Sequence, residues 1–142
     1  MPLQNFGSIL NFAEEIESLD RQFYAAAAGN LACAGHKELF AALEAESARN
    51  VTTVQRIRRE NVTEMILEPV KDFTRAPFCE ACEGAAVMAP DQVLATARKL
   101  ESRAERYYVE AAGKLKALPE VSRALKLLGK ARTARLAKLS AV

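Results

Sequence analysis

Residues 17–29 read ESLDRQFYAAAAG, and residues 101–113 read ESRAERYYVEAAG. Both stretches start with a Glu-Ser pair, continue to two adjacent aromatic residues and end on Ala-Ala-Gly. A recurrence of this kind within one chain indicates an internal repeat. We therefore expect a duplicated helical hairpin, with one copy in each half of the sequence.

The composition agrees with a helical chain. Of 142 residues, 50% are hydrophobic and 27% are charged, whereas only 6 are glycine and 5 are proline. Scarce glycine and proline among abundant Ala, Leu, Glu, Lys and Arg are typical of long helices. A chain of this length fits one domain with one core, so we expect a single all-α domain over residues 1–142.

Apolar residues recur at spacings of three and four in four segments, which predicts four long helices at 6–29, 37–66, 91–117 and 120–139. The first and third connections are short, whereas the second contains Pro69, Pro77 and Gly84. A short, long, short order is typical of a four-helix bundle with one long crossover, between helices two and three.

The charge and hydropathy patterns exclude some functions. Net charge is +2, but residues 1–90 carry 8 basic and 13 acidic residues, and residues 91–142 carry 12 and 5. The basic half lacks interleaved aromatic residues, so we favour two hairpins of complementary charge over nucleic-acid binding. No apolar run approaches a membrane span and MPLQNFGSIL is not a secretory signal, so we expect a cytoplasmic protein without membrane contact.

Each predicted helix carries polar residues on or beside its apolar seam at about mid-height. They are Glu17 in the first helix, Ser47 and Asn50 in the second, Glu101 in the third, and Arg132 and Arg135 in the fourth.

Two motifs carry a family resemblance. Glu17 and Tyr24 followed by Phe40-x-x-Leu43, and Glu101 and Tyr108 followed by Leu125-x-x-Leu128, resemble the rubrerythrin type of the ferritin-like superfamily over nearly the whole chain. The resemblance implies a ferritin-like four-helix bundle, commonly paired as a homodimer. It also implies two iron ions, bound by one Glu from each of helices one and three and one Glu-x-x-His from each of helices two and four.

Glu17 and Glu101 match the single glutamates, but the other ligand positions are degenerate. Ser47-x-x-Asn50 and Arg132-x-x-Arg135 stand where the two Glu-x-x-His motifs are expected. Guanidinium groups repel cations and cannot deprotonate to bind them. We expect the two arginines to pair with the two glutamates inside the bundle. The alternative is that the arginines extend to solvent and the glutamates lie on helix flanks.

The three cysteines and the histidine form a second pattern, Cys33-Ala-Gly-His36 and Cys79-Glu-Ala-Cys82. The inferred topology puts both pairs at one end of the bundle, where three thiolates and one imidazole would suit zinc or iron. A reversible Cys79–Cys82 disulfide and separately buried, inert cysteines are the alternatives.

Three functional hypotheses follow. The residues favour a non-catalytic bundle with a structural, metal-binding or sensing role and no catalytic residue. The family resemblance implies instead a non-haem iron oxidoreductase that handles iron, oxygen or peroxide with irregular ligands. The cysteine spacing allows a thiol redox protein acting through Cys79 and Cys82. Tyr24, Tyr107 and Tyr108 fit core packing better than a radical-carrying role.

Overall fold

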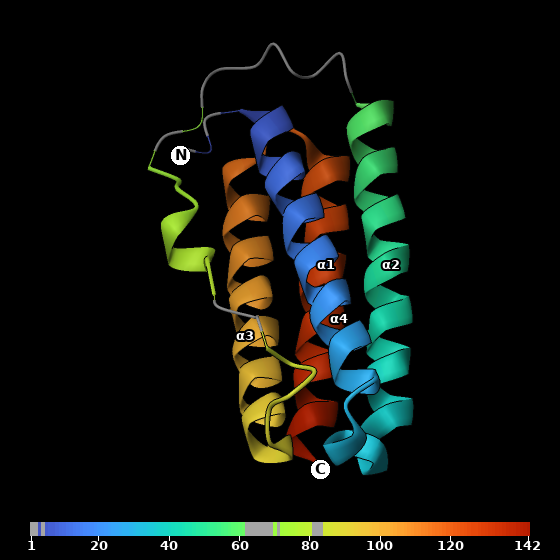
Figure 1. Ribbon diagram of the computed structural model, residues 1–142. Coiled ribbons are helices and arrows are strands. Elements are labelled where there is room, and N and C mark those ends of the chain that lie inside the picture. The colour runs from blue at the N-terminus through green and yellow to red at the C-terminus, as the bar shows by residue number, and fades with distance from the viewer. Residues whose placement is uncertain (1–2, 4, 62–69, 71, 81–83) are drawn as a thin grey trace.

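The computed structural model describes residues 3, 5–61, 70, 72–80 and 84–142. It is an all-α bundle of four long helices, α1 (Phe6–Ala28), α2 (Lys37–Glu60), α3 (Pro90–Lys114) and α4 (Pro119–Ser140), with short 3-10 helices η1 (Leu31–His36) and η3 (Ala76–Phe78). The main helix pairs are α1 with α2 and α3 with α4, and the long crossover joins α2 to α3 (Figure 1). The predicted fold class and crossover are confirmed.

Local chemistry fixes where the helices begin. Asn5 caps α1, because its side chain accepts a 2.8 Å hydrogen bond from the Ser8 amide and the Ser8 hydroxyl returns a bond to the Asn5 backbone. Proline opens both α3 and α4, at Pro90 and Pro119, where the missing amide hydrogen costs nothing.

Two predicted helices end earlier than the apolar spacing suggests. Helix α2 stops at Glu60, and the next residue, Asn61, donates both its backbone amide and its side-chain amide to the carbonyl of Ile57. Residues 62–66, which the pattern included in this helix, lie outside the described residues. Helix α3 stops at Lys114, and a short turn leads from it to Pro119.

Apolar side chains form two separate clusters along the bundle. The first gathers residues from the N-terminal half of α1 and the adjoining ends of the other helices, including Ile9, Ile16, Val54, Tyr107 and Leu125. The second lies toward the C-terminal end of α1 and includes Phe23, Phe40, Leu43, Ala97 and Leu139.

A polar layer separates the two apolar clusters. Along α1, Ile16 belongs to the first cluster and Phe23 to the second, and the buried Glu17 and Asp20 lie between them. We define the polar layer by the buried polar residues at this height in all four helices: Glu17, Asp20, Ser47, Glu101, Arg103, Arg132 and Arg135.

The described part of the crossover packs on α1 and α3. Phe73 and Phe78 are buried against Tyr107, with ring centroids 5.5 and 5.2 Å from that of the tyrosine. Arg75 lies over the Phe12 ring and forms an ion pair with Glu15. In Figure 1 this segment runs beside α3.

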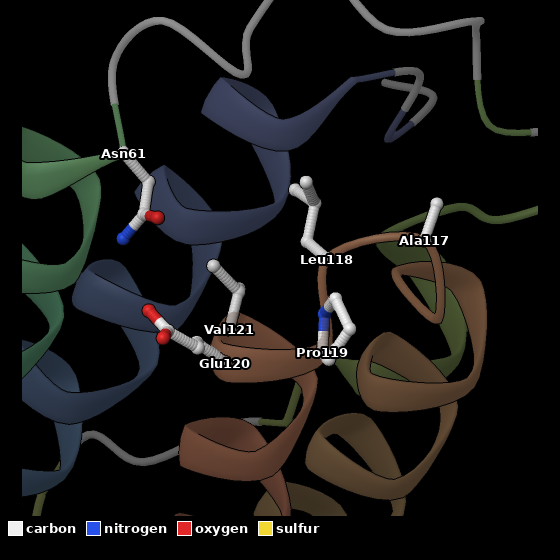
Figure 2. A pocket seen from close by; sticks show the side chains of 6 residues that line it. All are labelled: Asn61, Ala117, Leu118, Pro119, Glu120 and Val121. Carbon is white, nitrogen blue, oxygen red and sulfur yellow. The ribbon is translucent and has the colours of Figure 1, made fainter.

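The first connection and the segment leading into α3 lie at the same end of the bundle, as the sequence predicted. The side-chain amide of Asn30 donates hydrogen bonds of 2.9 and 2.8 Å to the carbonyls of Ala85 and Met88. At the opposite end, a shallow hollow is lined by Asn61, Ala117, Leu118, Pro119, Glu120 and Val121 (Figure 2). None of these residues belongs to the polar layer.

No helix among the described residues is long and apolar enough to cross a bilayer.

Candidate functional site

Arg132 lies at the centre of the polar layer and is fully buried. Its Nη1 atom lies 2.7 Å from Oδ2 of Asp20 and 2.8 Å from Oε1 of Glu101, and its Nη2 atom lies 2.8 Å from Oε1 of Glu17. One guanidinium from α4 therefore contacts carboxylates from both α1 and α3.

Arg135, one turn further along α4, contacts the facing helices. Its Nη2 atom lies 2.9 Å from Oε2 of Glu101 and donates a 2.8 Å hydrogen bond to the Ser47 hydroxyl. Its guanidinium carbon is 5.5 Å from the centre of the Tyr24 ring. Asn50 donates a 3.3 Å hydrogen bond to Glu17. The structure thus brings together all six residues that stand at the expected di-iron positions.

Asp20 and Arg103 complete the layer, and the sequence reasoning missed both. Nη2 of Arg103 lies 2.5 Å from Oδ1 of Asp20, and both side chains are buried. Asp20 follows Glu17 by one helical turn, so its spacing could have indicated it. Three carboxylates and three guanidiniums make the layer neutral overall.

Two tyrosines cross-link α1 and α3. The Tyr24 hydroxyl donates to Glu101, and the Tyr108 hydroxyl donates to Glu17, so each helix of the repeated pair supplies a donor to the other. Burial raises the pKa of both phenols well above their usual range, and the neighbouring carboxylates add to the rise. These side chains belong to the core, as predicted, but they also donate to the polar layer.

The charges of the layer determine its ionisation. Burial alone would lower the pKa of Arg132, but Glu17, Glu101 and Asp20 outweigh it and hold that pKa well above its usual range. Burial raises the pKa of the Asp20 carboxyl, although Arg132 and Arg103 oppose the rise. Arg132 is therefore a permanent cation, whereas Asp20 accepts a proton more readily than an exposed aspartate.

Hydrogen bonding in the layer is incomplete within the described residues. Nε and Nη2 of Arg132, and Nε and Nη1 of Arg135, are buried and have no acceptor in hydrogen-bond geometry. Nη2 of Arg132 is close to Glu17 but is not aligned with it, so this contact is an ion pair rather than a hydrogen bond. The layer therefore stabilises the bundle less than its charge balance suggests.

The polar layer does not fit a pair of iron ions. Such a site needs carboxylates with uncompensated charge and imidazole ligands. Here guanidinium nitrogens lie within 2.9 Å of oxygens of Glu17, Asp20 and Glu101. A divalent cation at the same place would meet two buried positive charges, Arg132 and Arg135.

The cysteine and histidine residues do not form a cluster in the described chain. Cys33 is buried in the second apolar cluster, and burial raises its thiol pKa. The His36 ring lies 6.1 Å from that of Phe40. Cys79 is exposed, and its thiol donates to the Arg75 carbonyl. Cys82 lies outside the described residues.

Within those described residues, no three His, Cys, Asp or Glu side chains are placed to hold a metal ion. The zinc or iron site at Cys33, His36, Cys79 and Cys82 therefore stays a prediction.

Comparison with protein families identifies the family of the chain. A family model described as a ferritin-like domain matches residues 7–131 and so covers most of the chain. No curated protein and no solved structure matches this chain. The matched range includes α1, α2, α3 and the first half of α4, and it ends just before Arg132. The chain therefore belongs to the ferritin-like domain family.

Proposed function

We propose that this chain is a non-catalytic, rubrerythrin-type member of the ferritin-like family. In this proposal the carboxylates and guanidiniums of the polar layer cross-link the four helices, in the place where relatives with intact ligand motifs would bind two iron ions. The bundle then has a structural or sensing role rather than an oxidoreductase role.

The observation that carries the proposal is the position of Arg132. Its two terminal nitrogens lie 2.7 to 2.8 Å from oxygens of Glu17, Asp20 and Glu101. A guanidinium forms such contacts through a planar fork and stays charged at all physiological pH values. The same carboxylates cannot neutralise iron while they neutralise Arg132.

The carboxylates of the layer are also poorly suited to proton transfer. Glu17 and Glu101 each accept a hydrogen bond from a tyrosine and contact a guanidinium, and both are fully buried. A general acid or base must reach the proton that it transfers. Glu17 and Glu101 are instead enclosed and already bonded to tyrosines and arginines of the layer.

The test is to restore the missing ligands. A variant with Ser47→Glu, Asn50→His, Arg132→Glu and Arg135→His carries both Glu-x-x-His motifs beside Glu17 and Glu101. We expect anaerobic titration with cobalt(II) to show about two ions per chain in this variant. The unaltered chain should bind none in the bundle centre.

Both proteins should carry Cys79→Ser and Cys82→Ser, so that thiolates contribute no signal. Cobalt or iron bound by the unaltered bundle centre would contradict the proposal, whether or not the restored variant folds. Turnover of oxygen or peroxide by the iron-loaded protein with the unaltered bundle centre would support the oxidoreductase alternative.

The predicted cysteine and histidine site is tested separately. About one zinc or iron ion per chain should purify with the unaltered protein and disappear in the Cys79→Ser, Cys82→Ser variant. The homodimer is likewise proposed from the family resemblance alone, and sedimentation would test it.

A further inference from the structure

Arg103 connects the polar layer to the crossover. It is a buried residue of α3, 2% exposed, and its side chain donates in three directions. Nη2 lies 2.5 Å from Oδ1 of Asp20, Nη1 donates to the Phe78 carbonyl at 3.3 Å, and Nε donates to the Leu100 carbonyl at 3.3 Å. The Arg103 side chain thus bonds to the polar layer and to the crossover at the same time.

We call residues 72–80 the crossover strap. Only Phe73 and Phe78 of the strap are buried, and both rings rest on Tyr107. The remaining strap residues are exposed or half-buried. A segment with so few buried contacts should open locally at lower free energy than the helices beneath it.

We propose that Arg103 latches the crossover strap to the polar layer, so that the charge of Asp20 sets how often the strap opens. Lifting the strap breaks the hydrogen bond between the buried Arg103 guanidinium and the Phe78 carbonyl. Breaking it costs free energy while Asp20 holds the guanidinium in place. When Asp20 loses its charge, Arg103 becomes an uncompensated buried cation and gains by turning outward, which breaks its bond to the strap.

The coupling works in both directions. Any change at the bundle centre that weakens the Asp20–Arg103 pair favours the open strap, and anything that holds the strap open weakens the pair. Asp20 does not need to touch the strap for this effect, because Arg103 bonds to both. The strap thereby reports the state of a layer that is itself buried.

The test is native-state hydrogen exchange of the strap amides. The amides of Phe78 and Cys79 donate to the carbonyls of Arg75 and Ala76 at 2.9 and 3.3 Å. These bonds lie within the strap's own turn, so their exchange measures the unravelling of that turn, which the bond from Arg103 to the Phe78 carbonyl restrains. We expect Asp20→Asn to speed their exchange by about tenfold or more. Exchange in α4 near Leu125 should rise less.

Arg103→Lys separates the latch from global unfolding. A lysine carries a single nitrogen without the guanidinium fork, so it can pair with Asp20 without also reaching the Phe78 carbonyl. We expect faster strap exchange with little change in the unfolding midpoint. Lys99→Met is the matched control, because Lys99 is an exposed cation on the same helix, and it should leave strap exchange nearly unchanged.

A double-mutant cycle decides the mechanism. If Arg103 carries the coupling, adding Asp20→Asn to Arg103→Met should speed strap exchange far less than Asp20→Asn does alone. Equal effects in both backgrounds would overturn the proposal. Unchanged strap exchange in Arg103→Lys would also overturn it.

Discussion

The two helical hairpins supply the polar layer unequally. Helices α1 and α3 share the glutamate and tyrosine positions of the repeat, although Asp20 and Arg103 have no counterpart in the other helix, and they exchange hydrogen bonds, Tyr24 to Glu101 and Tyr108 to Glu17. Helices α2 and α4 differ completely at the corresponding positions, where α2 has small uncharged side chains and α4 has two arginines.

Packing explains this inequality. The Arg135 guanidinium reaches from α4 to Glu101 on α3 and to the facing position on α2, so the residue at that position must be small. Ser47 meets that requirement and accepts a hydrogen bond from Arg135. The repeat is thus symmetric at the tyrosine and glutamate positions, through which α1 and α3 bond to each other. It is asymmetric at the α2 and α4 positions, where one long arginine side chain leaves no room for a second.

The largest expected effect comes from removing the central arginine. Arg132→Ala leaves three buried carboxylates short of a counter-charge, so we expect the free energy of unfolding to fall by about 3–5 kcal/mol. Urea denaturation measures it, and Lys130→Ala, an exposed change on the same helix, is the control. A loss under about 0.5 kcal/mol would show that the layer does not hold the bundle together.

The symmetric half of the layer predicts equal losses from its two tyrosines. Tyr24→Phe and Tyr108→Phe each remove a donor to a buried carboxylate, so each should cost about 1.5–3 kcal/mol. Tyr107→Phe removes a 2.5 Å hydrogen bond to the Ile9 carbonyl instead, a neutral acceptor, and should cost about 0.5–1.5 kcal/mol. Clearly unequal losses of stability in the Tyr24→Phe and Tyr108→Phe variants would show that the two tyrosines of the repeat do not contribute equally.

The packing of α2 against α4 predicts that an arginine of the polar layer can be moved from α4 to α2. Arg135→Ser vacates the space that Ser47→Arg would fill from α2, so the double variant should recover about 1–3 kcal/mol of the stability that Arg135→Ser loses. Thermal and urea unfolding of the three variants measure this recovery. If Ser47→Arg lowers stability further in the Arg135→Ser background, the space is not shared between α2 and α4.

The last prediction concerns alkaline pH, whose effect on stability is absent at neutral pH and grows above about pH 10. Tyr24, Tyr107 and Tyr108 are the only tyrosines, all are buried, and burial raises the pKa of each. Unfolded tyrosines release their protons near pH 10, whereas the folded ones keep them, so stability falls as pH rises above about 10.

Absorbance of the phenolate should therefore appear only as the protein unfolds. A native far-ultraviolet circular dichroism spectrum combined with full phenolate absorbance would contradict this prediction.

The fold could be predicted from the sequence because its signals are local. Helical apolar spacing, proline at the starts of α3 and α4, and the long second connection were sufficient for the bundle and its crossover. The end of α2 was less predictable, since the apolar spacing continues past Glu60, where the helix stops and the Asn61 side chain bonds to the Ile57 carbonyl.

The polar layer could be predicted only in part. Arg132 and Arg135 interrupt an apolar seam and Glu17 and Glu101 lie beside one, so the helical spacing of the sequence alone reveals these four residues. Arg103 lies toward the edge of its seam, and its partners Asp20 and the Phe78 carbonyl come from α1 and the crossover. Such a three-segment contact depends on tertiary packing, which helical periodicity does not encode.

The most direct test of the central claim is a crystal structure of the protein grown with iron(II) or cobalt(II) and analysed by anomalous scattering. We predict no metal peak between Glu17 and Glu101, with the Arg132 guanidinium within hydrogen-bonding distance of both carboxylates. A metal peak at about 2.0–2.2 Å from carboxylate oxygens of these two residues, with Arg132 turned away, would contradict it.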